Sequence, residues 1–108
     1  MHELGLLTGV IGAAKKAAGD RPILRVALRV GTRSGVVEDA LYAAWQVVGE
    51  GELVLELIPA TVFCPSCACE QEIDEFFALT CPACGTPTAD LRHGREFEIT
   101  YVDLATDP

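Results

Sequence analysis

The chain has few basic and few aromatic residues. It carries 8 Lys and Arg against 16 Asp and Glu, a net charge of −8 over 108 residues, and aromatic residues make up 6% of it. An acidic chain without a basic, aromatic-interleaved patch argues against binding to nucleic acid or to an anionic membrane surface. Its apolar runs are far below membrane-spanning length. Its first residues include no basic n-region, so we expect neither a membrane span nor a signal peptide.

Residue arrangements that carry catalysis are also missing from the sequence. We find no Ser-His-Asp set, no paired catalytic carboxylates and no phosphate-binding loop, and we therefore expect no enzyme. Half of the residues are hydrophobic, which argues against a disordered chain. The length suits one compact unit with a small appended module.

Two C-x-x-C pairs are the most specific motif. Cys64 and Cys67 form the first, Cys81 and Cys84 the second, with thirteen residues between them. Four thiolates at this spacing are typical of one tetrahedral Zn²⁺ and leave no open coordination position, which indicates a structural metal. Rubredoxin-like iron uses the same ligands, and a pair of disulfides or a group of free thiols also fits the spacing. Without a secretion signal, the motif favours the cytoplasm. Cys69 is interpreted as a spare thiol rather than another ligand.

Hydrophobic periodicity predicts two helices and three strands. The expected order is a helix over 4–18, a strand over 23–30, a helix that follows a cap at Ser34, and strands over 53–58 and 96–104. The first helix should end at Gly19. Its own glycines either permit close packing or loosen its N-terminal end, and the sequence does not decide between these. The expected buried stripes are Leu7, Val10, Ile11, Ala14 and Ala18 in the first helix, and Val37, Leu41, Ala44 and Val48 in the second.

Several side chains allow both a structural and a functional interpretation. Arg25 and Arg29 share the outer face of the first strand, where they are either solvated or available to an acidic partner. Trp45 and Tyr42 are interpreted as cover for the sheet rather than as binding residues. His93 is either a surface histidine or an extra metal ligand.

The expected fold class is α+β. It comprises a small mixed three-stranded sheet packed with two helices, plus an inserted zinc-ribbon-like module with four cysteine ligands. We assign residues 1–62 and 89–108 to an α/β domain and residues 63–88 to the zinc module. The strands on either side of the module are expected to pair antiparallel. The residues expected to cover the cysteines are Ile73, Phe76, Phe77 and Leu79.

The first three residues offer a second metal site. The amine of Met1, a backbone amide and the imidazole of His2 can together hold Ni²⁺ or Cu²⁺ in a near-planar nitrogen set. Glu3 can contribute its amide or its carboxylate. The competing interpretation is an accidental histidine at a frayed terminus.

The Met1-His2-Glu3-Leu4 start, the Ser34-Gly35-Val36 turn, the two cysteine pairs and Gly94-Arg95-Glu96 occur in the order seen in HypA/HybF proteins. The chain resembles this family of nickel metallochaperones over essentially its whole length. The resemblance implies nickel at Met1, His2 and Glu3, within the α/β domain, and structural zinc at the four paired cysteines. It also implies a HypB-type GTPase, the [NiFe] hydrogenase large-subunit precursor and, where urease is served, urease maturation factors as partners.

The sequence departs from the family pattern in places that leave both metal motifs intact. The connection from Val48 to Leu53 is shorter than usual, Thr32 and Arg33 replace a common Glu-Leu pair, and Gly5 stands where Ser is frequent. Two rival functions are a zinc-ribbon interaction module without nickel delivery and a thiol–disulfide enzyme. The acidic balance counts against a nucleic-acid-binding zinc ribbon, and two complete cysteine pairs favour metal binding over redox cycling.

Overall fold

The computed structural model describes residues 2–73 and 79–106. They pack as two compact units, which we describe separately. The first unit holds Met1–Arg29, Val36–Glu56 and Glu98–Pro108, and the second holds Val30–Gly35 and Leu57–Phe97. Among the described residues, no helix has the length and apolar character needed to cross a membrane.

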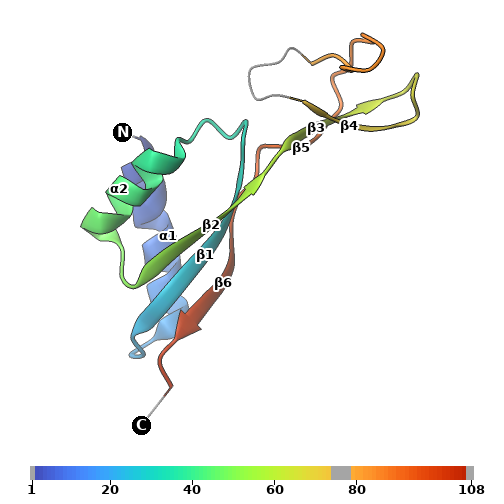
Figure 1. Ribbon diagram of the computed structural model, residues 1–108. Helices are drawn as coiled ribbons and strands as arrows, with labels where there is room; N and C mark the ends of the chain where they lie inside the picture. The colour runs from blue at the N-terminus through green and yellow to red at the C-terminus, as the bar shows by residue number, and fades with distance from the viewer. Residues whose placement is uncertain (1, 74–78, 107–108) are drawn as a thin grey trace. The chain divides into compact units, whose positions relative to one another are not determined.

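The first sheet has the strand order β2-β1-β6 (Figure 1). Its strands are β1 (Ile23–Gly31), β2 (Glu52–Ile58) and β6 (Phe97–Leu104). The ends of β1 and β2 lie together, since the N–H of Thr32 donates to the carbonyl of Ile58 at 3.0 Å. The end of β6 lies at the start of β1, where the N–H of Ala105 donates to the carbonyl of Pro22 at 2.9 Å. The sheet is therefore mixed, as expected.

The expected pairing between the strands that flank the zinc module is wrong. β2 and β6 each pair with β1, which occupies the centre of the sheet. The physical reason is burial: Val26 and Leu28 are both fully buried, so β1 is the strand most in need of neighbours on both edges. β2 is an edge strand and ends just before Pro59, which has no N–H for a further ladder bond.

The first helix, α1 (His2–Ala18), buries the stripe that the periodicity predicts. Leu7 is fully buried and Ala14 nearly so. The helix ends as expected at Gly19, which has a left-handed φ of 63° and donates its N–H to the carbonyl of Lys15 at 3.0 Å. Close packing does not explain the helical glycines, because a Cβ at Gly9 or Gly12 would meet nothing within 4 Å.

The second helix, α2 (Glu38–Val48), begins later than expected and packs against α1. Ser34 does not cap it; the N-cap is Val37, which offers no side-chain hydrogen bond. Val37 is 59% exposed, so its assignment to the buried stripe is also wrong. It fails because a residue in extended conformation before the helix does not follow the helical period. Leu41 keeps its place in the core.

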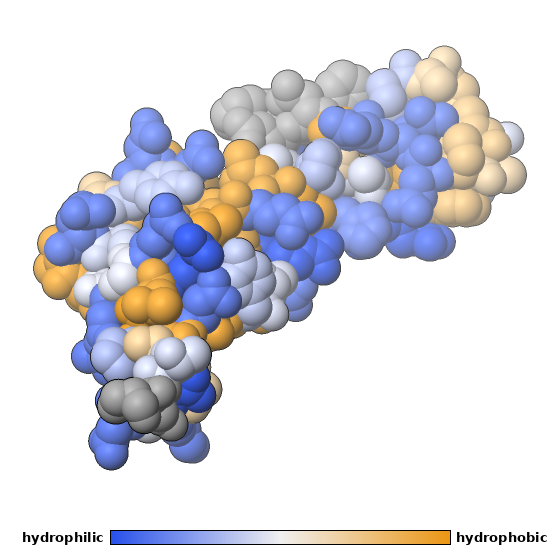
Figure 2. All heavy atoms as spheres, turned by 60° about the horizontal axis from the view of Figure 1, so that its bottom comes forward, coloured by the Kyte–Doolittle hydropathy of each residue, from blue (hydrophilic) through white to orange (hydrophobic). Residues whose placement is uncertain are grey.

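Trp45 is a core residue, as expected: it is 4% exposed and its Nε1–H donates to the carbonyl of Gly51 at 2.9 Å. Hydrophobic side chains outside the core also reach solvent, among them Tyr42 and Val47. Figure 2 shows hydrophobic residues at the surface as orange areas between blue hydrophilic ones. Exposed apolar residues of this kind are normal on a folded protein.

The outer face of the first sheet carries an ordered set of ion pairs. Arg25 contacts Glu52 of β2 at 2.7 Å and Asp103 of β6 at 2.8 Å. Hydrogen bonds from Arg25 to Glu52 and Asp103 raise its pKa above the ordinary value. Arg29 lies between Glu56 and Glu98 in the same way, at 3.9 and 3.4 Å. Both arginines therefore pair within their own sheet, which favours the structural interpretation over a docking role.

The second unit contains a sheet that the sequence analysis did not predict. Its strands are β3 (Ala60–Cys64), β4 (Cys69–Ile73) and β5 (Leu91–His93), in the order β4-β3-β5 with antiparallel pairing. The hydrophobic core cluster of this sheet comprises Ala60, Val62 and Ile73, with Leu79 and Leu91 packed against them. Phe76 and Phe77, expected to cover the cysteines, lie outside the described residues. The apolar core of this unit is small, so a metal would matter to its stability.

Candidate metal sites

The first cysteine pair sits at the tip of a β-hairpin. Cys64 closes β3 and lies opposite Cys69, which opens β4. Cys67 occupies the turn between them, and its N–H points to the sulfur of Cys64 at 3.3 Å. Ala68, the residue after Cys67, has a φ of 56°. This left-handed conformation is energetically unfavourable for any residue that has a Cβ. The hairpin thus holds both sulfurs on the inside of one tight turn.

The second cysteine pair is held by an equivalent turn. The N–H of Cys81 donates to the carbonyl of Thr86 at 2.9 Å, and the N–H of Gly85 donates to the carbonyl of Cys81 at 2.7 Å. Gly85 follows Cys84 with a φ of 77°. It therefore occupies in this turn the position that Ala68 occupies in the first. Glycine adopts this conformation without steric cost.

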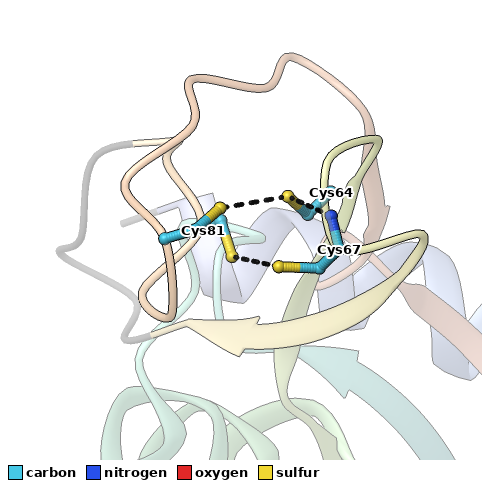
Figure 3. A group of neighbouring side chains, drawn as sticks. Cys64, Cys67 and Cys81 are labelled. Carbon is cyan, nitrogen blue, oxygen red and sulfur yellow. Dashed lines mark hydrogen bonds between the residues drawn. The ribbon is translucent and has the colours of Figure 1, made fainter.

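The two turns bring four sulfur atoms together, as the spacing predicts. The Sγ atoms of Cys64 and Cys84 are 3.5 Å apart, and those of Cys67 and Cys81 are 3.9 Å apart. Figure 3 shows Cys64 and Cys67 facing Cys81 across the site. All four sulfurs lie within 4.8 Å of one another. These separations are too long for disulfide bonds of about 2.05 Å. They fit a tetrahedron of zinc–sulfur bonds of about 2.3 Å, in which sulfurs are roughly 3.8 Å apart.

The surroundings of the sulfurs are unequal. Cys64 and Cys81 are 0% and 1% exposed, whereas Cys67 and Cys84 lie nearer the surface. A hydrogen bond from the Thr86 hydroxyl, with a second from its backbone, lowers the pKa of Cys84 to about 6. Hydrogen bonds with Cys84 and then Cys64 raise the pKa of Cys67 to about 12. A cation bound among the four sulfurs would favour the thiolate form of each of them.

The contacts of Thr86 were not foreseen from the sequence. Its hydroxyl lies 3.1 Å from the sulfur of Cys84 and also 3.1 Å from the hydroxyl of Ser66. Ser66 belongs to the first cysteine turn, so this pair of hydroxyls joins the two turns beside the sulfurs. Outer groups of this kind orient metal ligands. A threonine two residues after a C-x-x-C pair is the sequence signal that was available.

Two further candidates lie outside the four-sulfur group. Cys69 is exposed, and its sulfur accepts a hydrogen bond from the side chain of Gln71 at 3.2 Å. His93 is half exposed; its Nδ1 lies 3.0 Å from Glu96, and its Nε2 lies 3.8 Å from Glu70. The two carboxylates therefore approach opposite nitrogens of the ring.

The residues of the second motif are only partly described. Met1 and the side chain of His2 lie outside the described residues. The backbone of His2 begins α1. Glu3 is 6% exposed, and its Oε2 accepts the N–H of Val37 at 3.2 Å. The structure therefore does not test the nickel ligands, but it shows that the carboxylate of Glu3 has a partner within the protein.

A family model and individual relatives both match this chain, and they agree on the family. The family described as "Hydrogenase/urease nickel incorporation, metallochaperone, hypA" matches residues 1–104. The chain is 38% identical to a hydrogenase maturation factor HypA of Chloroflexus aggregans, with 95% of this chain and 98% of that protein covered. It is 36% identical to the protein of the same description from Streptomyces avermitilis, over 94% of this chain and 86% of that one.

Solved structures support the fold. The solution structure of the Ni metallochaperone HypA from Helicobacter pylori superimposes with a TM-score of 0.64 and 15% identity, covering 97% of this chain and 98% of that one. Another HypA solution structure gives a TM-score of 0.55. With the family match over nearly the whole length and the four-cysteine group in place, the chain belongs to the HypA family of hydrogenase and urease nickel-incorporation metallochaperones.

Proposed function

We propose that this protein is a nickel metallochaperone that binds Ni²⁺ through Met1, His2 and Glu3. It helps deliver the ion to the [NiFe] hydrogenase large subunit during maturation. The family membership carries this proposal, because the match begins at residue 1 and so includes the Met-His-Glu start. The work done is transfer of a metal ion rather than catalysis.

The backbone at the start of α1 suits nickel. The helix begins at His2, and the first four N–H groups of any helix lack an intrahelical acceptor. Amide nitrogens at positions 2 and 3 can therefore lose their protons and bind a metal without breaking a helical hydrogen bond. Together with the amine of Met1 and the imidazole of His2, they supply the nitrogen donors that Ni²⁺ accepts in planar geometry. Loading should weaken as the pH falls, because these donors must be deprotonated.

The four paired cysteines hold a second metal with a different task. Zinc at Cys64, Cys67, Cys81 and Cys84 would join the β3–β4 turn to the second cysteine turn, and its chemistry there is structural because four thiolates fill its coordination positions. We assign this role to a zinc module at residues 63–88. The remaining residues, 1–62 and 89–108, form the nickel-binding α/β domain.

The proposed partners follow from the transfer role. They are a HypB-type GTPase, the hydrogenase large-subunit precursor and, where urease is served, urease maturation factors. The net charge of −8 suits binding to basic protein surfaces and metal cations better than to nucleic acid. We place the protein in the cytoplasm, where thiolate ligands remain reduced.

Nickel titration of untagged, zinc-loaded protein tests the proposal. His2→Ala and a form with extra residues ahead of Met1 should both abolish binding of about one Ni²⁺ per chain, since each removes a terminal donor. His93→Ala is the matched control, because it removes the other histidine and should leave binding unchanged. Equal binding by all four proteins would move the site away from the terminus. No binding by any of them would favour a zinc-ribbon interaction module without nickel delivery.

A further inference from the structure

Glu3 is a buried carboxylate beside the proposed nickel terminus. Its exposed fraction is 6%, and it is the buried charged residue of the described part of the chain. Burying a carboxylate is costly unless hydrogen bonds compensate for the lost water. The compensation includes the N–H of Val37, which donates to Oε2 at 3.2 Å. The side chain therefore has a specific place in the first unit.

Val37 is the N-cap of α2, and it lacks the usual means of capping. Its backbone is extended, with φ −105° and ψ 127°, and it makes no side-chain cap hydrogen bond. In a capping box, a Glu at the third helical position reaches back to the N–H of the N-cap residue. Here that third position is Ala40, which has no acceptor. Glu3 makes this hydrogen bond from another helix, 34 residues earlier in the chain.

The charge of Glu3 also suits its location. The start of a helix carries a partial positive charge, and a nearby carboxylate is stabilised there. Moving the carboxylate to a metal would leave the N–H of Val37 without this acceptor and the start of α2 without this charge. The contact at α2 therefore competes with coordination of a metal through Oε2.

We propose that Glu3 is a positioning residue whose carboxylate ties the nickel-binding start of α1 to the start of α2 and does not bind the metal. Under this proposal, Glu3 offers Ni²⁺ its backbone nitrogen. This inference rests on the proposed nickel function. Holding Glu3 in place orders residues 2 and 3 before the metal arrives, which lowers the entropy cost of binding.

The test compares Glu3→Gln and Glu3→Ala, with Glu38→Gln as the matched control. Glutamine keeps an oxygen acceptor for the N–H of Val37 and removes the charge, whereas alanine removes both. Glu38→Gln removes a charge from the exposed first turn of α2 and leaves the hydrogen bond between Glu3 and Val37 in place. Nickel affinity is measured by competition with a chelator, coordination by the Ni²⁺ absorption spectrum, and the contact by hydrogen exchange of the Val37 amide in nickel-free protein.

We expect Glu38→Gln to stay within about twofold of the wild-type nickel affinity, and Glu3→Gln, which keeps the acceptor but loses the charge, to lose less affinity than Glu3→Ala with the wild-type spectrum. Glu3→Ala should weaken nickel binding by about fivefold and speed exchange at Val37, a loss of the size expected for a missing cap. Equal loss and a changed spectrum in both Glu3 variants would make the carboxylate a ligand and overturn the inference. Faster exchange in Glu3→Ala with unchanged affinity would also overturn it. If the wild type bound no nickel, the proposed function would fail. Hydrogen exchange at Val37 would still show whether Glu3 caps α2.

Discussion

Ala68 and Gly85 occupy equivalent positions after the two cysteine pairs, and their exchange gives a sharp stability prediction. Both residues are left-handed, with φ values of 56° and 77°. That conformation costs a residue with a Cβ about 1–2 kcal/mol. Glycine avoids this cost but loses about 0.5–1 kcal/mol more conformational entropy on folding. Ala68→Gly should therefore stabilise the first turn by about 0.5–1 kcal/mol, the difference between these two terms.

Gly85→Ala should destabilise the second turn by a similar amount. A Cβ at Gly85 would meet nothing within 4 Å, so the effect is conformational rather than steric. Because the turns place the zinc ligands, these free energies should appear as changed zinc retention. In competition with a chromophoric chelator, Ala68→Gly should hold zinc about two- to fivefold more tightly than wild type, and Gly85→Ala about two- to fivefold less tightly.

Ala83→Gly is the control for this pair. Ala83 lies inside the second cysteine turn without a left-handed φ. Glycine there gains no steric relief and should weaken zinc retention through chain entropy alone. The reasoning would be refuted if Ala68→Gly weakened retention as Ala83→Gly does.

Three further predictions concern the described core and loops. Gly9→Ala should raise the free energy of unfolding by about 0.5–1 kcal/mol in urea titration, because a Cβ there meets nothing and glycine weakens a helix; a loss of stability would show that this site requires glycine. Burial raises the pKa of Glu96, but hydrogen bonds from backbone N–H groups and His93 outweigh it and leave the pKa lowered. Its stabilising effect should therefore be complete above about pH 4.5 and disappear as the pH falls through the lowered pKa, so unfolding of zinc-loaded wild type and Glu96→Gln should converge in acid and not at neutral pH. Zinc removal should unfold the β3–β4–β5 sheet and leave most of the helical circular dichroism signal unchanged. Loss of the helical signal would contradict the view that the two units have separate cores.

The sequence predicts most reliably what depends on local pattern. The stripe of α1 follows from the helical period, and the ends of α1 and β1 agree with expectation to within two residues. The four-sulfur group follows from spacing, because a two-residue gap turns both thiols of a pair the same way. Trp45 was expected in the core from its size and apolar ring, and its hydrogen bond to Gly51 satisfies the one polar atom.

What the sequence could not predict depends on partners distant in the chain. Ser34 is a good capping residue by type, but the N–H of the actual N-cap, Val37, is bonded by Glu3. β4 reads Cys-Glu-Gln-Glu-Ile, a polar stretch with little strand character, and becomes a strand because β3 pairs with it in register. The pairing of β2 and β6 with β1 likewise depends on which strand is most buried. The nickel ligands stay a prediction, since Met1 and the His2 side chain lie outside the described residues.

The two proposed metal sites need opposite properties, and the chain separates them accordingly. Four thiolates, two of them fully buried, close the coordination of a tetrahedral ion and slow its exchange, which suits a metal that holds turns together. A cargo ion must be released, so its ligands should be few, reachable by a competing donor and free of structural duties. Nitrogens at the first residues of α1 meet those conditions, because helical hydrogen bonding does not use them. The carboxylate of Glu3 does not, because it accepts the N–H of Val37 at the start of α2.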